Sequence, residues 1–213
     1  KKIIKIASNF AKPVIIATGA SDISEVKSAI NLIYKNNKKI ILMQCNTNYT
    51  YNEDNFKYIN LNVLKTFKKI FKDKIILGLS DHTQGHSTVL GAVTLGARVI
   101  EKHFTDNNNR KGPDHYFSLN PITWAEMVKE TRRLEKALGN GKKIVEKNEK
   151  KTNFIQRRGS YAIREIRKNE TIKIKDIIFL RPYFNGSVSP FTNKKTFGKA
   201  KKNITKGQFV FKK

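Results

Sequence analysis

Two histidines near the middle of the sequence each follow a short apolar run that is typical of a buried strand. Residues 75–79 lead to His82, and residues 98–100 lead to His103. Between them, residues 87–96 have the small-residue composition of a helix that packs closely on a sheet. A strand, a helix and a strand at this spacing predict a parallel βαβ unit, in which neighbouring strands lie about 4.8 Å apart. Both histidines are therefore expected at the carboxyl-terminal edge of one sheet, where α/β proteins keep their active sites.

The chemistry that two such histidines can perform is metal binding. A neutral imidazole is a good ligand for divalent ions, and two of them leave coordination positions open for a substrate. A lone histidine is more often a structural residue. The placement of His82 and His103 after adjacent strands, each close in sequence to a carboxylate (Asp81 and Glu101), favours a site instead.

Further polar residues at predicted strand ends and in loops extend this candidate site. The hydroxyls of Thr18, Thr47 and Ser80 can contact a phosphate. Asp114 can bind sugar hydroxyls or cap a turn, and Arg181 can bind an anionic or amide-bearing ligand or stay solvated; the local sequence leaves these alternatives open. The remaining histidines, at positions 86 and 115, are expected to be peripheral.

The rest of the chain supplies the elements that must position these residues. Apolar runs predict two more strands at 13–18 and 39–45, and helical periodicity predicts helices at 22–35, 61–71 and 121–138. Four β-then-α units over residues 1–139 predict an α/β fold, either half of an eight-stranded barrel or a small open sheet. Residues 140–153 are rich in Lys and Glu and are predicted to form a linker. Residues 154–213 have the short alternating runs and turns of a separate, mostly β domain.

Composition excludes several classes of protein. The net charge is +26, but the lysines are scattered and no basic stripe is interleaved with aromatics, so nucleic-acid binding is not expected as the main function. No run approaches the roughly 18 apolar residues of a membrane span. The single cysteine, Cys45, rules out a disulfide within the chain, and a cytoplasmic location is expected.

Three motifs resemble the sialic acid synthase family, which makes N-acetylneuraminate, legionaminate or pseudaminate. They are Gly-Leu-Ser-Asp-His-Thr at 78–83, Glu-Lys-His-Phe-Thr-Asp at 101–106 and Gly-Pro-Asp at 112–114. The resemblance implies a (β/α)8 TIM-type barrel followed by a small antifreeze-like β domain, called SAF, at 154–213. Only the last four barrel units are represented, so the chain is predicted to be the carboxyl-terminal part of a longer enzyme.

The resemblance also implies an activity and a set of roles. The enzyme would be a transferase that condenses phosphoenolpyruvate with an N-acylated hexosamine, such as N-acetylmannosamine, to give a nine-carbon sugar acid and phosphate. It would use Mn²⁺, with Mg²⁺ or Co²⁺ as alternatives, and would form a domain-swapped homodimer. The implied residues are His82 and His103 for the metal, Glu101 in support, Ser80 and Asn46 or Thr47 near the phosphate, Tyr49 and Asp114 at the amino sugar, and Arg181 reaching over from the partner subunit. The alternative is a non-catalytic module, with a degenerate half-barrel, that binds carbohydrate or protein.

Overall fold

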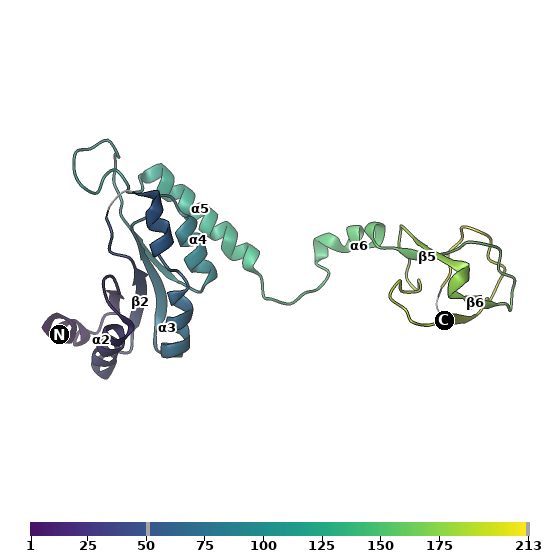
Figure 1. Ribbon diagram of the computed structural model, residues 1–213, viewed down its shortest axis with the longest axis horizontal. Coiled ribbons are helices and arrows are strands. Elements are labelled where there is room, and N and C mark those ends of the chain that lie inside the picture. The colour runs from purple at the N-terminus through teal and green to yellow at the C-terminus, as the bar shows by residue number, and fades with distance from the viewer. Residues whose placement is uncertain (50–51, 212–213) are drawn as a thin grey trace. The chain divides into compact units, whose positions relative to one another are not determined.

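A sheet of four parallel strands organises the first part of the chain (Figure 1). The computed structural model describes residues 1–49 and 52–211. The strands are β1 (Val14–Ala17), β2 (Ile40–Cys45), β3 (Ile76–Asp81) and β4 (Val99–Lys102), and each is hydrogen-bonded to the one before it. The chain therefore crosses the sheet in one direction, as in a β/α barrel and unlike a doubly wound sheet. The predicted α/β class is confirmed, in the form of a half-barrel sheet.

Helices alternate with these strands and cover one face of the sheet. They are α1 (Lys2–Ser8), α2 (Ile23–Asn36), α3 (Val63–Phe71), α4 (Ser87–Thr94) and α5 (Pro121–Leu138), with short 3₁₀ helices η1 (Glu53–Tyr58) and η2 (Lys72–Lys74). Successive right-handed crossovers in one direction place the connecting helices α2, α3 and α4 on the same side. The main core joins α2, α3 and α4 to the strands through Ile30, Ile33, Leu42, Leu64, Phe67, Leu79 and Ala92.

The other face of the sheet, which we call the concave face, presents three rows of side chains across the strands. The pairing register aligns Ile15, Ile41 and Ile76 in the first row, then Ala17, Met43, Gly78 and Val99, and finally Cys45, Ser80 and Glu101. Ile15 is 54% exposed and Ile76 is 48% exposed. Apolar rows therefore occupy most of this face, and its polar row lies at the carboxyl ends of the strands.

Strands β3 and β4 run two residues further than the apolar pattern predicted. Ser80 and Asp81 pair in register with Glu101 and Lys102. Polar residues can occupy these positions because their side chains find partners across the strands: Ser80 donates to Glu101, and Lys102 forms an ion pair with Asp81. The last two residues of each strand are therefore polar residues that pair with each other, and a search for apolar runs does not include them in the strand.

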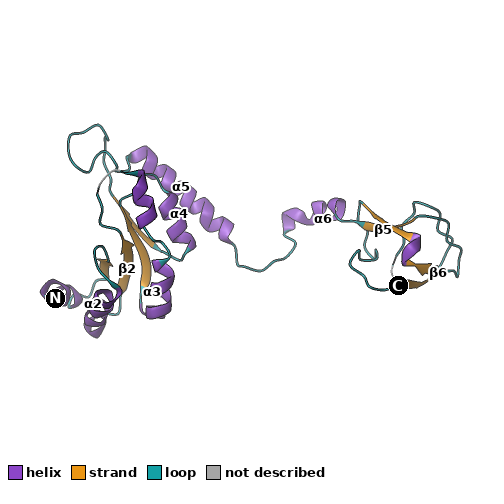
Figure 2. Cartoon of the chain, viewed as in Figure 1, coloured by secondary structure: helices purple, strands orange, loops and turns teal. Residues whose placement is uncertain are grey.

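The chain divides into two compact units, Lys1–Gly141 and Lys142–Lys213. The second begins with η3 (Lys147–Glu149) and α6 (Lys150–Gln156), so helical turns occupy part of the predicted linker segment. It continues with two antiparallel two-stranded sheets, drawn as orange arrows in Figure 2. The first sheet pairs β5 (Gly159–Ala162) with β7 (Ile177–Leu180), and the second pairs β6 (Thr171–Lys173) with β8 (Thr196–Lys199), with η4 (Ile174–Asp176) between β6 and β7.

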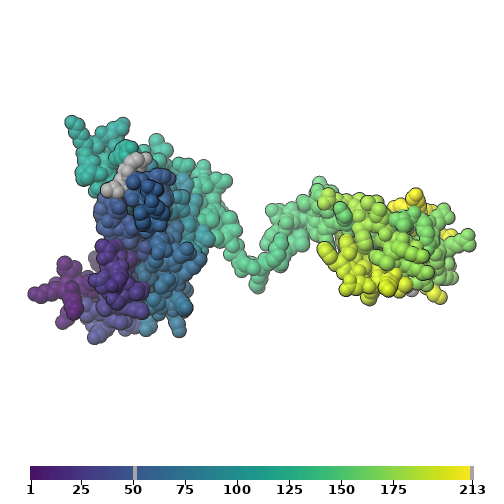
Figure 3. Space-filling view, in the orientation of Figure 1, coloured from purple at the N-terminus to yellow at the C-terminus, as the bar shows by residue number. Residues whose placement is uncertain are grey.

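The second unit has a core of its own, and Figure 3 shows its surface in green to yellow. Ile166, Val188 and Val210 are almost completely buried in it. The buried Asp176 carboxylate accepts a hydrogen bond from Arg164 Nε at 2.9 Å. No helix in the described part of either unit is both long enough and apolar enough to cross a membrane.

Candidate functional site

The structure brings His82 and His103 together at the carboxyl ends of β3 and β4. Their ring centroids lie 5.1 Å apart. The ring of Tyr49, in the loop after β2, lies 4.5 Å from that of His82 and 5.6 Å from that of His103. The ring of Phe117 also packs against that of His103, at 5.0 Å between centroids. Residues from three loops thus form one cluster at the edge of the sheet that the sequence predicted.

The orientation of His82 is fixed by the loop after β2. Its Nδ1 lies 2.9 Å from the carbonyl oxygen of Asn46. A carbonyl can only accept a hydrogen bond, so Nδ1 carries the proton and Nε2 keeps its lone pair. A hydrogen bond with the Cys45 thiol raises the pKa of His82 most strongly, and the Asn46 carbonyl adds to this against the effect of burial.

His103 has a different environment. Its Nδ1 lies 3.7 Å from Asp114 Oδ2, which is too long for a hydrogen bond. Burial and the neighbouring His82 lower the pKa of His103, and these effects outweigh the attraction of Asp114 and Glu101. His103 is therefore neutral near pH 7 and can offer a lone pair. The Asp114 carboxylate lies near His103 and its side chain is about half exposed. A ligand could therefore reach it, which favours ligand binding over the alternative of capping a turn.

The two imidazoles fit a shared divalent ion. An ion about 2.1 Å from a ring nitrogen lies roughly 3.2 Å from the ring centre, so centroids within about 6.5 Å can share one ion. The observed 5.1 Å meets this condition. The Asn46 carbonyl supplies the orienting contact that metal-binding histidines usually have. Within residues 1–49 and 52–211, no group of three or more His, Cys, Asp or Glu side chains is placed to hold a metal ion. The two imidazoles would therefore give a bound ion two protein ligands and leave its other positions open.

Ser80 and Glu101 form a second polar contact on the concave face. Ser80 Oγ donates to Glu101 Oε1 at 2.8 Å, and the Ser80 side chain is buried while Glu101 is exposed. Glu101 acts on His103 through its charge, raising the pKa of that imidazole. Glu101 thus lies beside the histidine cluster and is hydrogen-bonded to Ser80.

Three of the four predicted phosphate residues line a separate cavity of about 790 Å³ between the strand ends, α2 and α3. Thr18, Asn46 and Thr47 contribute to its wall, and His82 and His103 do not. Thr18 is buried, and its Oγ1 donates to the carbonyl of Met43 at 3.0 Å. Asn46 joins this cavity to the histidine cluster, because its side chain lines the cavity and its carbonyl holds His82.

Arg181 belongs to the second unit. Its Nε donates to the carbonyl of Gln156 at 2.6 Å, and the residue is exposed.

Sequence reasoning missed three residues of this region. Cys45 lies at the end of β2; burial opposes its ionisation, but hydrogen bonds with His82, Thr47 and Ser80 outweigh burial and lower its pKa. Phe117 forms a wall of the cluster, and Lys102 is a buried cation at the end of β4. A signal for Lys102 was available, since it immediately precedes His103 and strand alternation puts it on the same face of β4 as the apolar Ile100.

The sheet and the cluster define an α/β protein with a half-barrel of parallel strands and a histidine pair at their carboxyl ends. The chain belongs to the NeuB family, whose model matches residues 1–143. The family predicted from the two histidine motifs is thereby confirmed.

Individual relatives are consistent with this membership. The chain is 36% identical over 214 residues to the N,N'-diacetyllegionaminic acid synthase of Campylobacter jejuni, covering 99% of this chain and 61% of that protein. It is 44% identical over 173 residues to an uncharacterised protein of Methanocaldococcus jannaschii, covering 80% and 50% respectively. Among solved structures, the N-acetylneuraminic acid synthetase of Leptospira borgpetersenii matches with a TM-score of 0.63 at 32% identity, over 71% of this chain and 51% of that one. The chain spans about half to three fifths of the length of these relatives.

Proposed function

We propose that this chain carries the metal-binding part of a phosphoenolpyruvate-dependent synthase of nine-carbon sugar acids. The observation that supports this best is the 5.1 Å approach of His82 and His103 in a chain of the NeuB family. The relatives named as synthases of legionaminic, pseudaminic and neuraminic acids point to the same class.

Each residue of the cluster has a role in this proposal. His82 and His103 hold a divalent ion through Nε2, with Mn²⁺ as the expected metal and Mg²⁺ or Co²⁺ as alternatives. When bound, such an ion acts as a Lewis acid that polarises a carbonyl oxygen. Asn46 keeps His82 in the ligating tautomer. Tyr49 and Asp114 border the space beside the imidazoles, where they can contact the hydroxyl groups of a sugar.

The proposed reaction forms one carbon–carbon bond and releases one phosphate. The enol carbon of phosphoenolpyruvate attacks the aldehyde carbon of an open-chain N-acylated hexosamine, such as N-acetylmannosamine. Water then adds to the carbon that bears the phosphate, and inorganic phosphate leaves. We assign the phosphate-bearing substrate to Thr18, Asn46 and Thr47, which line the cavity next to α2 and α3, and to Ser80 on β3. Glu101 supports the site through Ser80 and through its charge on His103.

The proposal also includes the second unit, which we assign as an SAF domain. We assign Arg181 to the amino sugar of the partner subunit in a domain-swapped homodimer. A guanidinium offers a planar fork of donors, which suits amide and hydroxyl oxygens of such a sugar.

The first test replaces the ligands. His82→Ala or His103→Ala is introduced into the native protein. By native protein we mean the full polypeptide in which the source organism makes this chain. Each change removes one of two ligands, so Mn²⁺ affinity measured by calorimetry should fall at least 100-fold, and phosphate release from phosphoenolpyruvate with N-acetylmannosamine or a diacetylated analogue should stop.

His115→Ala is the matched control for this experiment. The Nδ1 atom of His115 lies 2.7 Å from Thr105 Oγ1, and His115 is not one of the two proposed ligands. Its loss should leave Mn²⁺ affinity unchanged. Unchanged affinity in both the His82 and His103 variants would refute the proposed metal site.

A further inference from the structure

A buried ion pair joins the ends of β3 and β4, next to the histidine cluster. Lys102 Nζ is 2.6 Å from Asp81 Oδ2, and the two side chains are 2% and 0% exposed. They pair in register at the ends of β3 and β4, on the face of the sheet that the helices cover. Asp81 immediately precedes His82, and Lys102 immediately precedes His103.

Further hydrogen bonds hold both members of this pair. The Asp81 carboxylate accepts from the backbone N–H and the hydroxyl of Thr83, at 3.1 and 2.9 Å, and from the hydroxyl of Thr88 on α4 at 2.5 Å. Lys102 Nζ donates a second bond to the carbonyl of Thr83 at 2.7 Å. Several simultaneous contacts restrict the movement of this buried pair, because a buried charge that loses its partners is costly.

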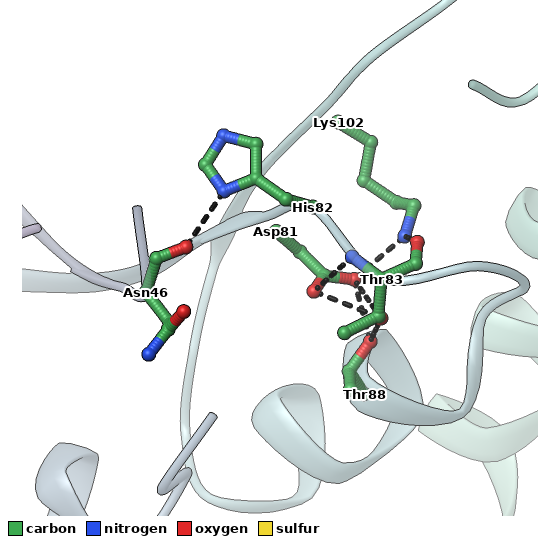
Figure 4. Close-up of polar contacts among 6 residues, drawn as sticks. All are labelled: Asn46, Asp81, His82, Thr83, Thr88 and Lys102. Atoms are coloured by element: carbon green, nitrogen blue, oxygen red, sulfur yellow. Dashed lines mark hydrogen bonds and ion pairs between the residues drawn. The ribbon is translucent and has the colours of Figure 1, made fainter. Parts of the chain in front are cut away.

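Lys102 therefore holds the chain on both sides of His82. It binds the side chain of Asp81 before the histidine and the carbonyl of Thr83 after it. Figure 4 shows the ammonium group between these two contacts, while the ring of His82 points away toward Asn46. Side chains alternate along a strand, which explains why the ion pair lies toward the helices and the imidazoles lie on the opposite side.

We propose that Lys102 is a positioning residue for the histidine pair. Through its two contacts it fixes the backbone at residues 81–83 relative to the end of β4. The 2.9 Å contact of His82 Nδ1 with the Asn46 carbonyl depends on that backbone. The ion pair thus keeps His82 in the tautomer with Nε2 free, and keeps both imidazoles at one spacing. The inference concerns a site whose metal rests on the proposed function, so its test needs a readout that works without metal.

The experiment compares the wild-type native protein with the variant Asp81→Asn/Lys102→Met. Removing both charges together avoids leaving one of them buried alone, which keeps the variant folded. The metal-free proteins are labelled with ¹⁵N, and the tautomer of His82 is read from its ring nitrogen shifts at about pH 9, where an ordinary imidazole is neutral. Mn²⁺ affinity is measured separately by calorimetry.

We expect one His82 tautomer, protonated at Nδ1, in the wild type and a mixture of both tautomers in the double variant. Mn²⁺ affinity of the variant should fall 10- to 100-fold, as for other groups that orient metal ligands. The matched control is Thr88→Val, which removes one hydrogen bond to Asp81 but leaves both contacts of Lys102. It should lower thermal stability without changing the tautomer.

Three results would overturn the proposal: mixed tautomers in the wild type, a wild-type tautomer and affinity in the double variant, or an equal tautomer change in Thr88→Val. Failure of the proposed function gives a different pattern. In that case the wild type binds no Mn²⁺, yet its His82 tautomer is still fixed and is still lost in the double variant.

Discussion

At the residue scale, the two histidines differ in the electrostatics of their surroundings. The contact with Cys45 raises the pKa of His82, whereas burial lowers the pKa of His103. Both effects follow from position, because one ring faces a thiol and a carbonyl and the other packs against Phe117. The two imidazoles are therefore protonated at different pH values, His82 at a higher pH than His103.

This difference predicts the pH dependence of metal binding. As pH falls, His82 is protonated first, at a pH above its ordinary value of 6.5, and His103 is protonated later, below 6.5. A protonated imidazole cannot bind a metal, so Mn²⁺ affinity should fall about tenfold per pH unit once His82 is protonated and more steeply after His103 follows. Calorimetric titrations at a series of pH values measure this.

The single variant His82→Ala provides the control. It retains only His103, so its weaker residual affinity should persist to a lower pH than the first decline seen in the wild type. An affinity that rises on acidification, or the same midpoint in both proteins, would contradict the assignment of the first step to His82.

At the element scale, strand β3 is held closely between its two neighbours. A Cβ atom at Gly78 would lie 2.7 Å from Met43 Cγ on β2 and 2.9 Å from the carbonyl oxygen of Val99 on β4. Neither distance is tolerated between real atoms, and the second contact is with backbone. Glycine at this position lets β3 lie where its last residues align with β4 and His82 approaches His103.

We predict that Gly78→Ala destabilises the first unit by about 1–3 kcal/mol, the range for overpacking a well-packed site. Denaturation in urea measures the change. Gly91→Ala on α4 is the matched control, because its added Cβ meets only the flexible end of Leu61 and alanine favours the helix. Gly91→Ala should be neutral or stabilising. Equal destabilisation by both changes would show that close strand spacing at Gly78 is not the cause.

At the scale of the whole molecule, the concave face leaves a row of apolar side chains of the first unit partly exposed. A parallel sheet with apolar residues on both sides is normally covered on both sides. Here the helices cover one side, while Ile15 and Ile76 remain about half exposed on the other. The longer relatives include about as much additional sequence as they share with this chain.

The 213-residue chain studied alone is therefore expected to self-associate and to lack synthase activity. Ile15→Lys should reduce association, measured by analytical ultracentrifugation, because it places a charge in the apolar row. Ile122→Lys is the matched control, since Ile122 is 80% exposed on α5 and away from that row. A monodisperse monomer with full synthase activity would contradict this expectation.

The assignment of Arg181 to the partner subunit is also tested at this scale. In the native protein, Arg181→Ala should raise the Michaelis constant for the amino sugar or lower turnover, with little effect on phosphoenolpyruvate binding. Mixing inactive His103→Ala with Arg181→Ala should restore some activity, because a mixed dimer contains one intact histidine pair served by one intact Arg181. No recovery after demonstrated subunit exchange would mean that Arg181 does not act across a dimer.

The sequence alone determined the elements and the family. Apolar runs and helical periodicity located the four parallel strands and their helices, because burial imposes those patterns on any chain that forms them. The motifs around His82 and His103 identified the NeuB family, and their position after two strands placed them at one edge of the sheet. These are local properties, because each can be recognised within one stretch of the sequence.

Only the tertiary structure decided how the site is held together. The contact of His82 with the Asn46 carbonyl joins residues 36 positions apart, and the ion pair of Lys102 with Asp81 joins residues 21 apart. Such partners are chosen by strand order and register, which no local pattern specifies. For the same reason, the sequence could not show that Thr18 and Thr47 line a cavity apart from the histidines, or that Glu101 binds Ser80.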